Sequence, residues 1–188
     1  MFDGTYALLM AEYNQWMNGK LYAGCARLSD EERKRDRGAF FKSIHGTLNH
    51  LVWGDRGWLP RFNGKSYATG PVGVDLYDDF GALTAARAEM DEEILTWARG
   101  VTPEWLAEPM TWTSRLYGFT QTHPRWVQVM QMFNHQTHHR GQAHAMLTAA
   151  GVDIGATDLP MLPLLGASRG EPASSARRGP SREGSGTL

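Results

Sequence analysis

The chain has 188 residues, a mass of 21.0 kDa, a formal net charge of −1 and 41% hydrophobic residues. This suits one domain of about 100–200 residues with its own apolar core. The near-neutral charge gives no general attraction to nucleic acid, and no apolar run approaches the roughly 20 residues of a membrane span. The N-terminal stretch lacks the features of a signal peptide, and Cys25 is the single cysteine, so we expect a cytoplasmic protein without internal disulfides.

Apolar residues recur at helical spacing in four long segments, at about 3–26, 39–62, 77–99 and 124–150. Phe40 opens the apolar stripe of the second segment. Ser29 followed by Glu32 predicts a capping box that opens a short helix or leads into a longer one. Pro124 begins the last segment and Gly151 ends it, as is typical of helix termini. The sequence therefore predicts an all-α protein built as a four-helix bundle.

Three other segments are expected outside these helices. Residues 63–76 are rich in Gly and contain a Pro, which indicates a loop. Residues 110–121 are β-branched and aromatic around a turn-like centre, which predicts a short β-hairpin before the last helix. Residues 166–188 are mostly small, polar or charged and cannot bury enough surface to offset their ordering entropy. We therefore predict a domain over 1–165 and a disordered tail over 166–188.

Four of the seven histidines lie within ten residues, at His135, His138, His139 and His144. His135 and His139 are four residues apart on a predicted helix, so they share a face and could reach one metal ion. Position 136 is Gln, so the general base of an HExxH metalloprotease is missing and that class is excluded. His138 and His144 are expected to be ordinary polar residues of the helix surface.

A zinc-like site needs a third protein ligand, and the second predicted helix offers two candidates, His45 and His50. Helical geometry does not choose between them. Asp55 falls within the apolar stripe of the same helix, where a carboxylate is costly unless it is paired. It could hydrogen-bond a ligand imidazole, or it could form an ion pair with Arg56 or Arg140 that has no part in any site.

The remaining reactive or aromatic residues have simpler interpretations. His123 is expected to be a cap or turn residue near the hairpin. Cys25 has only Arg27 nearby to lower its pKa, so it is expected to be a buried and inert thiol. Most tryptophans fall on core positions, whereas Trp53 and Trp112 lie off the pattern and could line a pocket.

Two stretches together resemble the DinB family: FFKSIHGTLNHLVWGDRGWLPRF over 40–62 and MFNHQTHHRGQAHAML over 132–147. The predicted hairpin also fits, and the resemblance extends over about 1–165. It implies an up-down-down-up four-helix bundle, a homodimer, and a metal ion bound by three histidines. Carried onto this chain, the ligands are His50 of NHLVWGD together with His135 and His139 of HQTHH. Arg140 and Gln142 match family residues that pack helices or support the ligands, and no catalytic residue is assigned.

Characterised relatives that the chain resembles transfer thiols such as bacillithiol or mycothiol, or isomerise maleylpyruvate with mycothiol. Three neutral imidazoles leave a divalent ion with open positions, where it would lower the pKa of a bound thiol or water. The resemblance therefore implies a divalent ion (Zn, Ni or Fe) in a metal-dependent thiol S-transferase or, less favoured, a hydrolase, with a small-molecule substrate.

The alternative is a non-catalytic, metal-binding stress-response protein of the same fold. A DNA-associated protein is disfavoured because the folded part lacks a basic stripe. We expect neither a nucleic-acid partner nor a membrane partner. A catalytic site predicts an open coordination position beside a pocket, whereas a structural site predicts four protein ligands.

Overall fold

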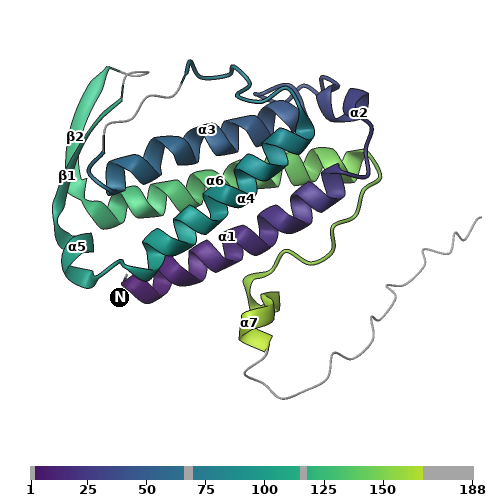
Figure 1. The fold of residues 1–188 in the computed structure, drawn as a ribbon. Helices are drawn as coiled ribbons and strands as arrows, with labels where there is room; N and C mark the ends of the chain where they lie inside the picture. Colours follow the sequence, from purple (N-terminus) through teal and green to yellow (C-terminus); the bar gives the residue numbers. More distant parts are fainter. Residues whose placement is uncertain (1–2, 66–69, 115–117, 167–188) are drawn as a thin grey trace, which may run out of the picture. The chain divides into compact units, whose positions relative to one another are not determined.

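The structure, a computed structural model, describes residues 3–65, 70–114 and 118–166. Its long helices are α1 (Gly4–Cys25), α3 (Ile44–Phe62), α4 (Phe80–Arg99) and α6 (Arg125–Ala149). Shorter elements are α2 (Asp30–Lys34), α5 (Pro103–Ala107) and the antiparallel hairpin of β1 (Pro109–Ser114) and β2 (Phe119–Pro124). The predicted all-α bundle with a hairpin before the last helix is confirmed (Figure 1). Within the described residues, no helix combines the length and apolar character that crossing a membrane requires.

The four long helices run up, down, down and up along the chain (Figure 1). α1 packs against α4 and α6, and α3 packs against the same two helices. Because α3 and α4 run in the same direction, the connection between them returns the chain to the end of the bundle where α3 begins. This topology places α3 and α6 side by side, so residues far apart in sequence can share one site.

Side-chain caps define where the helices start. Asp3, Ser43 and Asp79 accept hydrogen bonds from backbone N–H groups three residues further on, at 3.2, 3.0 and 2.7 Å. Ser29 accepts from the N–H of Glu32 at 3.2 Å, which confirms the predicted start of α2. Such caps satisfy N–H groups that have no partner within the first helical turn.

The predicted start of the second long helix was wrong. α3 begins at Ile44, because Ser43 is its cap, and the preceding residues form a tight turn closed by a bridge between Ala39 and Lys42. Lys42 has a φ of 63°, in the left-handed region. Phe40 therefore does not belong to the apolar stripe of a helix and is 81% exposed. α5 was not predicted from the sequence; Thr102 caps it by accepting a hydrogen bond from the backbone N–H of Trp105.

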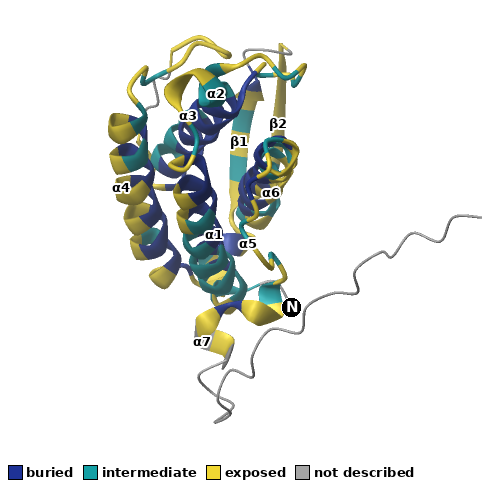
Figure 2. Ribbon diagram, turned by 90° about the vertical axis from the view of Figure 1, so that its right-hand side faces the viewer, coloured by how far each residue is buried: buried dark blue, intermediate teal, exposed yellow. Residues whose placement is uncertain are grey.

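The core of the bundle consists of two apolar clusters, one toward each end, with a polar layer between them. Figure 2 shows the buried faces of the long helices turned toward one another. We define the polar layer as the polar side chains of the middle of the bundle that are at most 5% exposed: Asn14, Asn18, Asp55, Arg87, Asp91, Gln136 and Arg140. All four long helices contribute to it.

Arg87 joins the polar layer together. Its guanidinium lies 2.5 Å from Asp55 on α3 and 3.0 Å from Asp91 on α4. Asn18 on α1 donates to Asp91 at 2.9 Å. Burial raises the pKa of both carboxyl groups, and the guanidinium opposes that rise. Of the two interpretations of Asp55, the ion pair holds, but its partner is Arg87 on α4 rather than Arg56 or Arg140.

The chain divides into two units, Met1–Thr157 and Asp158–Leu188. The first contains the bundle and the hairpin. The described part of the second consists of η1 (Leu159–Met161) and α7 (Pro163–Gly166). Residues 167–188, nearly all of the predicted disordered tail, lie outside the described residues, and the domain boundary at 165 stays a prediction.

Replacing Arg87 with Met tests the energetic role of the polar layer. The change leaves Asp55 and Asp91 buried without their cation, so we expect the free energy of unfolding to fall by about 3–5 kcal/mol. Denaturant unfolding followed by circular dichroism measures this. The control is Lys34→Met, which removes the exposed ion pairs with Asp30 and Asp78 and should leave the midpoint nearly unchanged. Equal effects of the two substitutions would contradict this role.

Candidate metal centre

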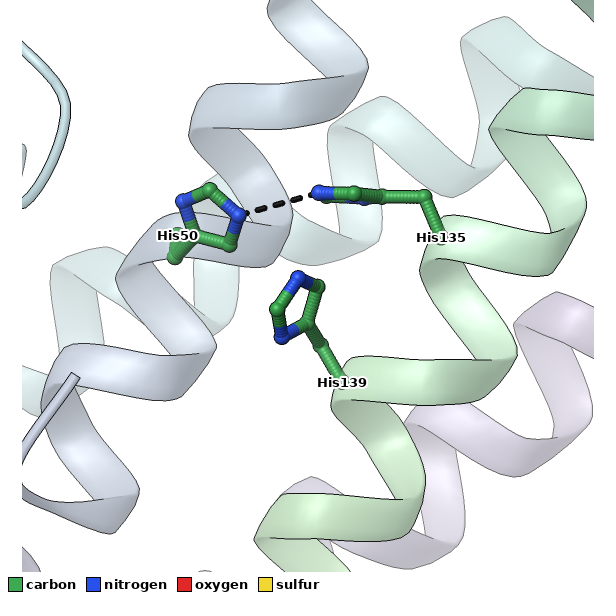
Figure 3. Close-up of side chains that lie close together, drawn as sticks. All are labelled: His50, His135 and His139. Atoms are coloured by element: carbon green, nitrogen blue, oxygen red, sulfur yellow. Dashed lines mark hydrogen bonds between the residues drawn. The ribbon is translucent and has the colours of Figure 1, made fainter. Parts of the chain in front are cut away.

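Three imidazole rings from two helices converge inside the bundle. His50 comes from α3, and His135 and His139 come from successive turns of α6 (Figure 3). One ring nitrogen from each lies within 4.8 Å of the others, and the ring centroids are 4.4 to 4.9 Å apart. The structure thus brings together the three histidines that the family resemblance assigned as ligands, while their binding of a metal stays a prediction.

The distances between the rings fit a shared cation. The Nε2 atoms of His50 and His135 are 2.9 Å apart, so the two rings can share a proton between them. A tetrahedral divalent ion with bonds of about 2.0–2.1 Å would hold two such nitrogens about 3.3 Å apart. A small separation of these two rings would bring their nitrogens to that distance, and the ring nitrogen of His139 lies within 4.8 Å of both.

Gln142 sets the orientation of the third ring. Its amide lies 2.7 Å from Nδ1 of His139 and 3.1 Å from Nε2 of His138. When the NH2 group of Gln142 donates to His138, its carbonyl oxygen accepts the proton of His139 Nδ1. Nε2 of His139 then keeps its lone pair for a metal ion. This is the supporting role that the resemblance implies for Gln142, whereas Arg140 belongs to the polar layer.

Burial keeps the candidate ligands neutral. It lowers the pKa of His50 to about 3, and the neighbouring His135 and His139 add to the effect. Burial, followed by His139 and His138, lowers the pKa of His135 to about 4. The pKa of His139 is also lowered by burial, although its bond to Gln142 opposes the change. Because metals bind the neutral imidazole, all three rings are in the competent form at neutral pH.

Two aromatic side chains stack on the ring of His50, one from the turn before α3 and one from α3 itself. The ring of Phe41 stacks on His50 with centroids 3.8 Å apart, and the ring of Trp53 stacks with centroids 5.4 Å apart. Trp53, one of the two off-pattern tryptophans, therefore borders the site, while Trp112 packs against Trp58. Phe41 was missed by the sequence analysis because its turn had been assigned to a helix.

Gly54 allows the ring of His135 to lie against α3. A Cβ atom at position 54 would be 2.7 Å from Cε1 and 3.2 Å from Nδ1 of His135. Any larger residue would therefore push the ring away from His50. Gly54 was not predicted to be a site residue, because it lies inside a regular helix and no local signal marks it.

The other candidates lie outside the cluster. His45 is fully buried, with Nε2 2.8 Å from the carbonyl oxygen of Tyr77, so it has a structural partner. His123 is not the expected cap or turn residue: it lies on β2, opposite Met110 in the hairpin, with Nε2 3.2 Å from Oε1 of Gln121. Burial raises the pKa of Cys25 to about 12, which makes the thiol unreactive at neutral pH, as expected.

The described residues supply three candidate protein ligands for a metal ion instead of the four of a structural zinc site. Within residues 3–65, 70–114 and 118–166, no fourth His, Cys, Asp or Glu joins the three histidines. Asp55 does not support a ligand, because Nδ1 of His50 and of His135 are buried with no partner in this part of the chain. The expected pocket beside the site stays a prediction, because the two hollows of the described residues lie elsewhere: one is lined by Trp97 and Trp105, the other by Tyr13 and Arg140.

Comparison with known proteins agrees with this architecture. The model of the DinB family matches residues 1–168. A curated protein of Bacillus subtilis (strain 168), "Protein DinB", is 27% identical over 160 residues, which cover 81% of this chain and 91% of that protein. The family match includes α3 and α6, the two helices that carry the three histidines.

Replacing Gly54 with Ala tests the candidate metal site in a protein that keeps its fold. The new methyl group would displace the flexible ring of His135, so affinity for Zn²⁺ should fall by roughly 10–100-fold, the range seen when the support of a ligand is lost. Alanine also favours a helix over glycine by about 1 kcal/mol, so the protein should stay folded. Isothermal titration with Zn²⁺ measures the affinity.

The matched control for this substitution is Gly19→Ala on α1, where an added Cβ meets no atom within 4 Å. It should gain the same helical preference without any change in Zn²⁺ affinity. Unchanged affinity in Gly54→Ala would show that the packing of His135 on α3 does not control the site.

Proposed function

The chain belongs to the DinB family, and from this membership and the three-histidine geometry we propose that it is a metal-dependent enzyme acting on a low-molecular-weight thiol. The observation that carries the proposal is the convergence of three neutral imidazoles with no fourth protein ligand in the described residues. Structural zinc sites use four protein ligands, whereas catalytic sites keep a position open. Imidazole ligands suit Zn, Ni and Fe alike.

Each residue of the site has a role in this proposal. His50, His135 and His139 would hold the ion, and Gln142 would keep His139 in the tautomer that binds. The ion would supply an open position and positive charge that lower the pKa of a thiol or water at neutral pH. Phe41 and Trp53 would exclude water around His50 and offer apolar surface to the organic part of a substrate.

The aromatic rings of Phe41 and Trp53 favour a thiol over water as the group that the ion would activate. Sulfur is polarisable, and it makes favourable contacts with aromatic rings. Transfer would then join the sulfur to an electrophilic carbon as the thiol gives up its proton and the leaving group departs. This favours an S-transferase over a hydrolase on the same three histidines.

The test is a conjugation assay with a panel of low-molecular-weight thiols and an alkylating electrophile. A free thiol near pKa 8.5 is only a few per cent ionised at pH 7, so metal-loaded protein should raise the conjugation rate on the order of tenfold or more. His139→Ala should abolish the increase, and Gly19→Ala should retain it.

Spectroscopy of the cobalt-loaded protein separates the alternatives. Binding of a thiol should change the cobalt absorption, since sulfur is a ligand very different from imidazole. An unchanged spectrum and a background rate with every thiol, in protein that holds its metal fully, would contradict the enzyme proposal. That result would support the non-catalytic metal-binding alternative.

A further inference from the structure

A second feature of the bundle is a hollow of about 600 Å³ that contains none of the three histidines. It is formed by the end of α3, the second half of α4, and α5. Its volume falls within the range of about 300–1,000 Å³ that is typical of small-molecule sites. Its lining combines three aromatic rings, Phe62, Trp97 and Trp105, with two carboxylates, Glu92 and Glu93.

The three rings form two walls that meet at a steep angle. Phe62 and Trp97 are nearly parallel, at 21°, with centroids 5.0 Å apart. Trp105 stands at 89° to Phe62 and 70° to Trp97, with centroids 5.9 Å from each. Aromatic faces carry negative electrostatic potential and attract cations, most strongly in the case of tryptophan.

The charged side chains that line the hollow are negative, as are the electrostatic potentials of the aromatic faces. Among the residues that the structure describes, the side chains that line the hollow include two carboxylates and no Lys, Arg or His. Glu92 accepts a hydrogen bond from Gln15 at 2.6 Å. The side chain of Glu93, which is exposed on α4, makes no ion pair or hydrogen bond within the described part of the chain. Arg125 lies over the ring of Trp105 at 4.8 Å, but it pairs with Glu108 and does not line the hollow.

We propose that this hollow binds a small organic cation whose charged group is a quaternary ammonium. Such a group is bulky and weakly hydrated, so its methyl groups can contact ring faces without a large desolvation cost. The carboxylate of Glu93 attracts the charged group, so the hollow would bind the cation more tightly than an uncharged molecule of the same shape. The site is independent of the histidines, so it does not require the proposed thiol chemistry.

The test compares choline with 3,3-dimethyl-1-butanol, in which carbon replaces the charged nitrogen. The indole N–H signals of Trp97 and Trp105 in nuclear magnetic resonance spectra report binding, after assignment with Trp97→Phe and Trp105→Phe. We expect saturable shifts with choline and binding of the alcohol that is on the order of tenfold weaker. Equal binding of both molecules, or no saturable shift with choline, would overturn the proposal.

Glu93→Gln tests the carboxylate without altering its shape. Choline affinity should fall about threefold to tenfold in this variant, while the Zn²⁺ affinity of the histidines stays the same. The matched control is Glu89→Gln, at an exposed position one turn earlier on α4 and outside the lining. Equal choline affinity in Glu93→Gln and Glu89→Gln would show that the carboxylate plays no part.

Discussion

The buried ion pair between Asp55 and Arg87 is the interaction on which the arrangement of the helices depends. Neither side chain reaches solvent, so any register that separated them would leave the carboxylate of Asp55 buried without its cation. Apolar side chains can keep contact when one helix slides along another, because their attraction has no direction. Buried charges contributed by four helices cannot, because each needs its own partner. His50 lies five residues before Asp55, and His135 lies next to Gln136 of the same layer. The layer therefore sets the level at which the three histidines meet.

The candidate metal site depends on this alignment because its three histidines come from α3 and α6, which pack closely against each other. Gly54 removes the side chain that would otherwise separate α6 from α3, and the ring of His135 occupies the space. Burial and mutual repulsion keep the imidazoles neutral, and Gln142 turns the lone pair of His139 toward the other rings. The result is three convergent ring nitrogens beside two aromatic side chains, which is the arrangement an open metal site requires. Binding of the ion would displace the proton that His50 and His135 share.

Much of this fold follows from local sequence signals, while the details of the site do not. Periodicity and caps predict the long helices and the hairpin because these signals act over three or four residues. Periodicity could not separate His45 from His50, since both are buried on α3 at 0% and 8% exposure. The choice rested on the family motif, and the structure gives His45 a carbonyl partner instead. Arg87, Phe41 and Gly54 were missed because their roles arise only where distant elements pack together.

The most direct test of the central claim is the metal content of protein purified without a histidine tag, measured by elemental analysis after loading with Zn²⁺ and exhaustive dialysis. Three convergent imidazoles should retain about one ion per chain. His139→Ala should lose it, while His123→Ala, which alters the histidine on the hairpin, should keep it. Full metal content in His139→Ala, or none in the unaltered protein, would contradict the assignment of His50, His135 and His139 as a metal centre.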